Sequence, residues 1–222
     1  MNDDNIVPWR IKQEKCALLV IDMQNDFLKP DGVLYFDDTP MKAVPNIERL
    51  LELCRRLEVP VIYTKTLLKD HFDISPLEVC YQPVLLEKGM REGTWGAEII
   101  GELAPMPEDQ IIIKHRYDAF FNTNLELVLH NIRGLGVVDT LIVVGTVTNV
   151  CCESTARAAF MRDYKVVFVS DANGASDSAA HSATLHNISR YFGRVLDTQT
   201  LVAAMTDGED SLMSMADYLA LI

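Results

Sequence analysis

The chain lacks the features that mark several classes of protein. Its 222 residues carry a formal net charge of −12, and no basic stripe stands out that could neutralise nucleic-acid phosphates. No apolar run is long enough to cross a bilayer, and the opening MNDDNIVPWRIKQEK has no run of signal-peptide length. We therefore expect a cytoplasmic protein with no nucleic-acid partner and no membrane partner.

Cysteine is scarce and is not arranged for metal binding or cross-linking. The five cysteines are odd in number and include no CxxC or Cys/His spacing. A chain of this length also does not need disulfides to complete a core, so a reducing compartment is the simplest assignment. There is no internal repeat, low-complexity segment or flexible linker, which predicts one domain over residues 1–222.

The apolar pattern predicts an α/β fold, a three-layer α-β-α arrangement around an open six-stranded, mostly parallel sheet in the order 3-2-1-4-5-6. Apolar runs that are fully hydrophobic indicate strands covered on both faces, and apolar residues at helical spacing separate them. Strands are expected at residues 16–21, 61–64, 110–114, 141–145, 166–170 and 194–196, and helices at 44–57, 95–103, 124–132 and 176–191. Residues 65–93 show weak periodicity and predict a surface excursion, and the apolar residues of 208–222 could pack on a neighbouring subunit.

Three ionisable residues stand at the ends of three of these strands. Asp22 ends the first strand, Lys114 ends the third, and Cys151 follows the fourth and opens a helix. In sheets of this kind ligands bind outside the carboxyl ends of the strands, near the point where the strand order reverses. Each residue alone has a simpler interpretation. Asp22 could be a turn residue, Lys114 a solvated strand end and Cys151 a buried apolar thiol. Their placement at one edge favours a site.

The chemistry of the three residues is complementary. The N–H groups of a helix N-terminus favour a thiolate at Cys151 and can hold the oxyanion that forms when it attacks a carbonyl. Asp22 in a partly dry pocket could accept the thiol proton. A nearby Lys114 would lower the thiol pKa and hold the carboxylate in place.

Three segments resemble, in the right order, the signatures of the isochorismatase-like cysteine hydrolases. They are LLVIDMQNDF around Asp22, IIIKHRYDAFFNT around Lys114 and GTVTNVCCESTARAA around Cys151. The resemblance implies the isochorismatase-like hydrolase fold, with Cys151 as nucleophile, Asp22 as general base and Lys114 organising both. It further implies an oxyanion hole made by the backbone N–H groups of Val147 and Cys151, with a cis peptide between Thr146 and Val147.

Two departures narrow the subclass that the resemblance implies. Isochorismate-cleaving members typically lack the cysteine, so Cys151 favours the amidohydrolase branch. Nicotinamidase-type members carry an Asp-x-His-x-x-His metal site after the second strand, whereas TLLKDHFDISP holds His71 alone, so we expect no metal and no cofactor. KHRYDAFFNT and TNVCCEST are most similar to the ureidoacrylate hydrolase type.

The resemblance therefore implies a cysteine-dependent amidohydrolase that acts on a small ureido or carbamoyl compound. The expected substrates are ureidoacrylate-like compounds, N-carbamoyl amino acids or biuret, cleaved through a thioester with release of ammonia, in a homodimer or homotetramer. The alternatives are hydrolysis of another small amide, hydrolysis of a vinyl ether, and a non-catalytic member of the fold that binds a ligand. The candidate substrate-binding residues lie beside the signatures, and they are Tyr117, Trp95, Phe27, Phe121, Gln24 and Asn25. The last two could equally shape the turn after the first strand.

Overall fold

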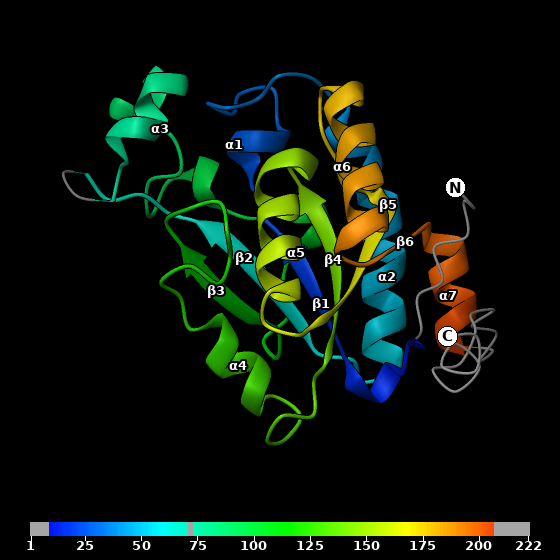
Figure 1. The fold of residues 1–222 in the computed structure, drawn as a ribbon. Coiled ribbons are helices and arrows are strands. Elements are labelled where there is room, and N and C mark those ends of the chain that lie inside the picture. Colours follow the sequence, from blue (N-terminus) through cyan, green and yellow to red (C-terminus); the bar gives the residue numbers. More distant parts are fainter. Residues whose placement is uncertain (1–8, 71–72, 207–222) are drawn as a thin grey trace.

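The computed structural model describes residues 9–70 and 73–206 of the chain and contains one six-stranded sheet (Figure 1). The strands follow the order β3-β2-β1-β4-β5-β6, and all five neighbouring pairs are parallel. Their bounds are β1 Cys16–Ile21, β2 Val61–Thr66, β3 Gln110–Lys114, β4 Thr140–Thr146, β5 Lys165–Gly174 and β6 Arg194–Leu196. The predicted α/β class and strand order are confirmed.

Helices connect the strands and cover the sheet. The α-helices are α1 Asn25–Leu28, α2 Val44–Arg56, α3 Pro76–Tyr81, α4 Leu125–Asn131, α5 Glu153–Phe160, α6 Ser178–Tyr191 and α7 Thr198–Thr206. A π-helical turn, Thr148–Cys152, leads into α5. Short 3₁₀ turns occupy Gln13–Lys15, Pro40–Ala43, Pro83–Leu86, Trp95–Ala97 and Gly101–Leu103.

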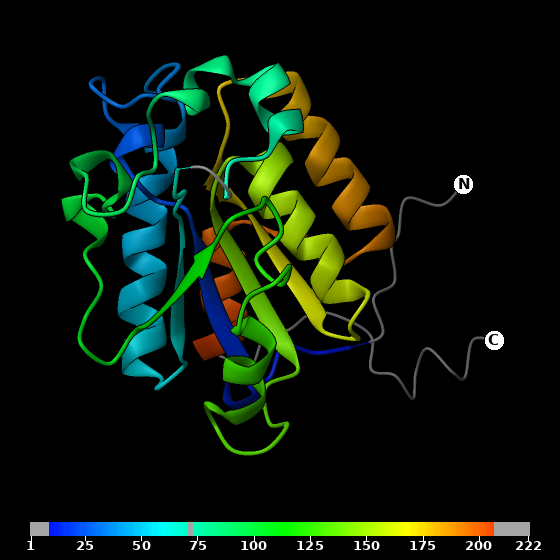
Figure 2. The same cartoon turned by 90° about the vertical axis from the view of Figure 1, so that its left-hand side faces the viewer.

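The central strand β1 is buried along its whole length because helices pack on both faces of the sheet. Its side chains alternate between two cores: Leu18 packs with residues of α2 and α7, and Leu19 packs with residues of α4, α5 and α6. Figure 2 shows α2 on one side of the sheet and α5 and α6 on the other. The predicted three layers are therefore present.

The prediction of a helix over residues 95–103 is wrong, because the segment forms two separate 3₁₀ turns. The backbone between them pairs with the chain that follows β1, because Gln24 and Ile99 form an antiparallel bridge and the Ile100 N–H donates to the Met23 carbonyl at 2.9 Å. Backbone groups engaged in this tertiary pairing are not available for helical hydrogen bonds, so packing overrides the local pattern.

Other elements differ from the prediction mainly in length. β2 continues through Thr66 into the expected surface excursion, and β5 runs to Gly174 after a register shift against β4. α7 had no counterpart in the prediction. Residues 208–222 lie outside the described part of the chain, so the single-domain prediction for 1–222 stays a prediction. No helix within residues 9–70 and 73–206 has both the length and the apolar character needed to span a membrane.

Candidate active site

The strand ends bring Asp22, Lys114 and Cys151 together at one edge of the sheet. Asp22 directly follows β1, Lys114 is the last residue of β3, and Cys151 lies in the π-helical turn after β4. β2 lies between β1 and β3, so the Lys114 side chain extends past β2 to reach Asp22. The juxtaposition is a direct consequence of the strand order, because all these strands point the same way.

Lys114 contacts both other members of the site. Its ammonium lies 2.6 Å from Asp22 Oδ2 and 3.6 Å from Cys151 Sγ, and both Lys114 and Asp22 are fully buried. It also donates to Thr66 Oγ1 and to the Arg116 carbonyl, each at 2.9 Å. Burial is the largest single effect and lowers the pKa of Lys114, but Asp22 and Cys151 together outweigh it and hold the lysine pKa above its ordinary value.

Two threonines of β2 fix the Asp22 carboxylate. Thr64 Oγ1 donates to Oδ1 at 2.7 Å, and Thr66 Oγ1 donates to Oδ2 at 3.1 Å. The Thr64 hydroxyl also accepts the backbone N–H of Asp22, whose φ of 47° lies in the left-handed region that non-glycine residues seldom occupy. Sequence reasoning missed both threonines, although their alternate spacing on the strand next to the first was a usable signal.

The backbone around Cys151 is shaped by Gly145 and by a cis peptide. Gly145 has a φ of 128°, and a Cβ placed there would lie 2.2 Å from the Ile21 carbonyl oxygen, so only glycine allows β4 to approach β1 here. The Thr146–Val147 peptide is cis, as the resemblance implied. The π-helical turn that follows carries Cys151; such turns occur often at functional sites.

Burial favours the protonated form of Cys151. Burial raises its pKa to about 12; the Lys114 ammonium acts in the opposite direction, and the charge of the Asp22 carboxylate raises it further. Burial and Asp22 therefore oppose the thiolate that Lys114 and the helix N-terminus were expected to favour. The carboxylate that can accept the thiol proton contacts the same Lys114 ammonium as the sulfur.

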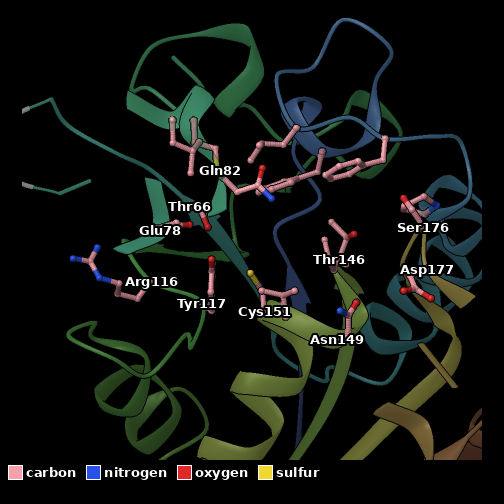
Figure 3. A pocket seen from close by; sticks show the side chains of 18 of the residues that line it. Thr66, Glu78, Gln82, Arg116, Tyr117, Thr146, Asn149, Cys151, Ser176 and Asp177 are labelled. Carbon is pink, nitrogen blue, oxygen red and sulfur yellow. The ribbon is translucent and has the colours of Figure 1, made fainter. Parts of the chain in front are cut away.

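A cavity of about 350 Å³ opens above Cys151. Figure 3 shows Glu78 and Tyr117 on one side of Cys151, and Asn149, Ser176 and Asp177 on the other. The rest of the lining is mainly apolar and includes Phe27, Leu34, Phe36, Pro40, Leu85, Met90, Val147 and Val150. A volume of this size suits a small molecule.

The predicted substrate-binding residues fall into two groups. Phe27 and Tyr117 line the cavity. Trp95 and Phe121 do not; they are 53% and 51% exposed, and Phe121 lines a separate small depression. The prediction that these two aromatic side chains contact the substrate is therefore corrected, since both lie outside the cavity lining.

Gln24 and Asn25 also lie outside the cavity lining, where they support the backbone. The Gln24 amide donates to the Thr66 and Ala97 carbonyls and accepts the Thr66 N–H, while Asn25 donates to the Trp95 carbonyl. Their amides are occupied by these bonds because the chain after β1 must satisfy its buried polar groups. The turn-shaping interpretation of both residues is the one that the geometry favours.

Glu78, Arg116, Asn149, Ser176 and Asp177 line the cavity without having been predicted. Glu78 lies in α3, inside the segment that gave no periodic signal, so the sequence offered no means of finding it. His71 lies outside the described residues. Within the described part of the chain, no three His, Cys, Asp or Glu side chains gather in a way that could hold a metal ion.

Comparisons with known proteins agree with this geometry. The model of the Isochorismatase domain family matches residues 16–200. Nicotinamidase 3 of Arabidopsis thaliana is 35% identical over 188 residues, covering 83% of this chain and 86% of that protein. Ureidoacrylate amidohydrolase RutB of Acinetobacter baylyi is 35% identical over 211 residues, covering 87% and 84% respectively.

Solved structures give the same assignment. A cysteine hydrolase from Pseudomonas syringae pv. phaseolicola superposes with a TM-score of 0.82 at 34% identity, over 90% of this chain and 97% of that one. N-carbamoylsarcosine amidase from Thermoplasma acidophilum has a TM-score of 0.69 at 28% identity, over 83% and 96%. With a family model that spans the whole sheet and relatives named as amidohydrolases, the chain belongs to the isochorismatase family of hydrolases.

Proposed function

We propose that the protein is a cysteine amidohydrolase that cleaves the C–N bond of a small ureido or carbamoyl compound through a thioester. The observation that carries the proposal is the buried contact of Asp22, Lys114 and Cys151 at the floor of the cavity. The relatives named as ureidoacrylate amidohydrolase and N-carbamoylsarcosine amidase support the ureido or carbamoyl class.

The first step is attack by the Cys151 sulfur on the substrate carbonyl. With a pKa of about 12, only about one thiol in 10⁵ would ionise freely at pH 7. The proton therefore passes to Asp22 as the Sγ–C bond forms, since the carboxylate and the sulfur contact the same Lys114 ammonium. The Lys114 ammonium stays charged and keeps the carboxylate oriented.

The negative charge that develops on the carbonyl oxygen needs donors. The backbone N–H groups of Val147 and Cys151 are the proposed oxyanion hole, and both residues line the cavity. Collapse of the intermediate breaks the C–N bond, and Asp22 returns its proton to the departing nitrogen. Water, deprotonated by Asp22, then attacks the thioester and releases the thiol. A carbamoyl substrate would yield ammonia and carbon dioxide with the remaining amine.

The test is ammonia release from ureidoacrylate, N-carbamoyl amino acids, biuret and nicotinamide by the wild type and by Cys151→Ala. Cys80→Ala is the matched control, because Cys80 is an exposed thiol that does not itself line the cavity. We expect release from at least one ureido compound, abolished by Cys151→Ala and unchanged by Cys80→Ala. Turnover that survives Cys151→Ala on every active compound would refute the thioester route.

Two other outcomes identify the alternatives. Hydrolysis of a vinyl ether that survives loss of Cys151 but not of Asp22 would identify an isochorismatase-type reaction. Tight binding of one of these compounds without turnover would identify a ligand-binding member of the fold.

A further inference from the structure

The side wall of the cavity contains a carboxylate that the proposed reaction does not use. Glu78, from α3, is half-buried and lines the cavity together with Tyr117, which follows β3. Both side chains also line a smaller depression beside the cavity, and each perturbs the pKa of the other, so the tyrosine hydroxyl lies beside the carboxylate. Burial raises the pKa of both groups, that of Tyr117 to about 12, so the tyrosine keeps its proton and remains a donor.

Glu78 lies near the reacting end of the cavity. Its carboxylate interacts electrostatically with the ammonium of Lys114, and Tyr117 interacts with Cys151. Figure 3 shows Tyr117 beside the Cys151 sulfur and Glu78 above Tyr117 on the same side, next to Thr66. A small substrate whose carbonyl carbon contacts Sγ would therefore place its neighbouring nitrogen within reach of this pair.

Arg116 also lines the cavity, but it does not present its charged group beside Cys151. Its guanidinium points away from Cys151 in Figure 3, and Nη1 donates to the Asp73 and His115 carbonyls. Burial raises the pKa of Glu78, and the positive charge of Arg116 acts in the opposite direction, toward the ionised carboxylate. The charged group presented beside the thiol is thus an acceptor.

An ionised carboxylate can only accept hydrogen bonds, and it has about four lone-pair positions. Even with the Tyr117 hydroxyl beside it, the carboxylate keeps acceptor positions for a molecule in the cavity that it lines. A primary carboxamide or carbamoyl group has two N–H donors, whereas the corresponding ester has none. We propose that Glu78, oriented by Tyr117, accepts an N–H of the substrate's primary amide or carbamoyl group and so selects these compounds over esters.

This inference rests on the proposed function, since it assigns a specificity residue to the same site. When an ester replaces the amide, the dehydrated carboxylate loses its partner, and sites built to bond an N–H reject analogues that lack it. A hydrogen bond to a charged group corresponds to about a 10- to 100-fold preference. Glu78→Gln keeps the shape and removes the charge, so most of that preference should disappear.

The experiment uses alkylation of Cys151, which requires no knowledge of the substrate. Iodoacetamide carries a primary amide, and methyl iodoacetate is the matching ester. In each reaction the Sγ–C bond forms, the C–I bond breaks, iodide leaves, and the thiol proton passes to Asp22. Rates are measured by mass spectrometry of the peptide that contains Cys151, so that alkylation of the exposed Cys80 is scored separately.

The measured quantity is the ratio of the iodoacetamide rate to the methyl iodoacetate rate at Cys151. We expect Glu78→Gln to lower this ratio about tenfold or more, and Tyr117→Phe to lower it less because the carboxylate remains but loses its orientation. Glu87→Gln, which removes an exposed carboxylate outside this cavity, should leave it unchanged. If Glu78→Gln is too unstable to purify, Tyr117→Phe carries the test.

An unchanged ratio in Glu78→Gln, or in Tyr117→Phe where only that variant folds, overturns the proposal. A fall of equal size in Glu87→Gln also overturns it, because the effect would then be one of overall charge. Alkylation does not require turnover, so the two proposals fail separately. Amide hydrolysis with an unaltered ratio rejects only the role of Glu78, whereas an altered ratio without any hydrolysis rejects only the proposed function.

Discussion

Replacing Lys114 by methionine would leave the Asp22 carboxylate buried without its ammonium partner. Both side chains are fully buried, and their charged atoms lie 2.6 Å apart. Coulomb's law at an effective dielectric constant of about 20 gives roughly 6 kcal/mol for such a pair at that distance. Removing one partner of a buried pair typically costs about 3–5 kcal/mol, a large part of the about 5–15 kcal/mol that holds a domain folded. We expect Lys114→Met to lose about 3–5 kcal/mol of unfolding free energy.

A double-mutant cycle isolates the pair. Asp22→Asn should be destabilising for the same reason, because it leaves the ammonium unpaired. The double variant Asp22→Asn/Lys114→Met contains no buried charge, so it should be more stable than the sum of the two losses predicts by about 1–3 kcal/mol. All four proteins are compared by urea unfolding, with the midpoint and slope recorded for each.

The matched control is the ion pair of Lys65 and Glu98, which joins similar groups at 2.9 Å but leaves the glutamate side chain 56% exposed. Its coupling should be below about 1 kcal/mol. Losses at Asp22 and Lys114 that add within about 0.5 kcal/mol would refute the conclusion that these two residues form a buried charge pair.

Three further perturbations follow from the same geometry. Thr66→Val removes the hydroxyl that links the buried carboxylate and ammonium, and should lower stability in urea by about 1.5–3 kcal/mol, whereas Thr66→Ser should not. Gly145→Ala places a Cβ 2.2 Å from the Ile21 carbonyl oxygen and should cost at least about 3 kcal/mol by thermal unfolding; a loss below about 0.5 kcal/mol would contradict the close approach. Burial raises the pKa of the Cys54 thiol to about 12. The stability that the protonated thiol contributes is therefore complete below the unfolded-state pKa of about 8.5, and it is lost as the pH rises toward 12. The unfolding free energy of the wild type should fall more steeply between about pH 8 and pH 10 than that of Cys54→Ala, by about 1 kcal/mol per pH unit on average.

The strand pattern was sufficient to predict which residues would meet. Fully apolar runs indicated a sheet covered on both sides, and in a parallel sheet the strand ends converge on one edge. Asp22, Lys114 and Cys151 could therefore be placed together before any coordinates were known, and the structure brings them into contact.

Features set by tertiary packing could not be predicted in this way. The pairing of Gln24 with Ile99 breaks the expected helix, and it joins segments that are far apart in the sequence. The high pKa of Cys151 depends on how completely the fold removes water, which no local pattern reports. Glu78 lies in a segment without periodicity, so its place in the cavity wall emerged only from the fold.

The central claim is that the substrate carbonyl is transferred to Cys151 before water releases it. The most direct measurement is turnover of an active amide in the presence of hydroxylamine, which competes with water for a thioester. The account predicts that hydroxamate, or hydroxyurea from a carbamoyl group, forms at the expense of the hydrolysis product, and that Cys151→Ala forms neither. Ammonia release at the normal rate without any hydroxylamine adduct would show direct attack by water and would contradict the account.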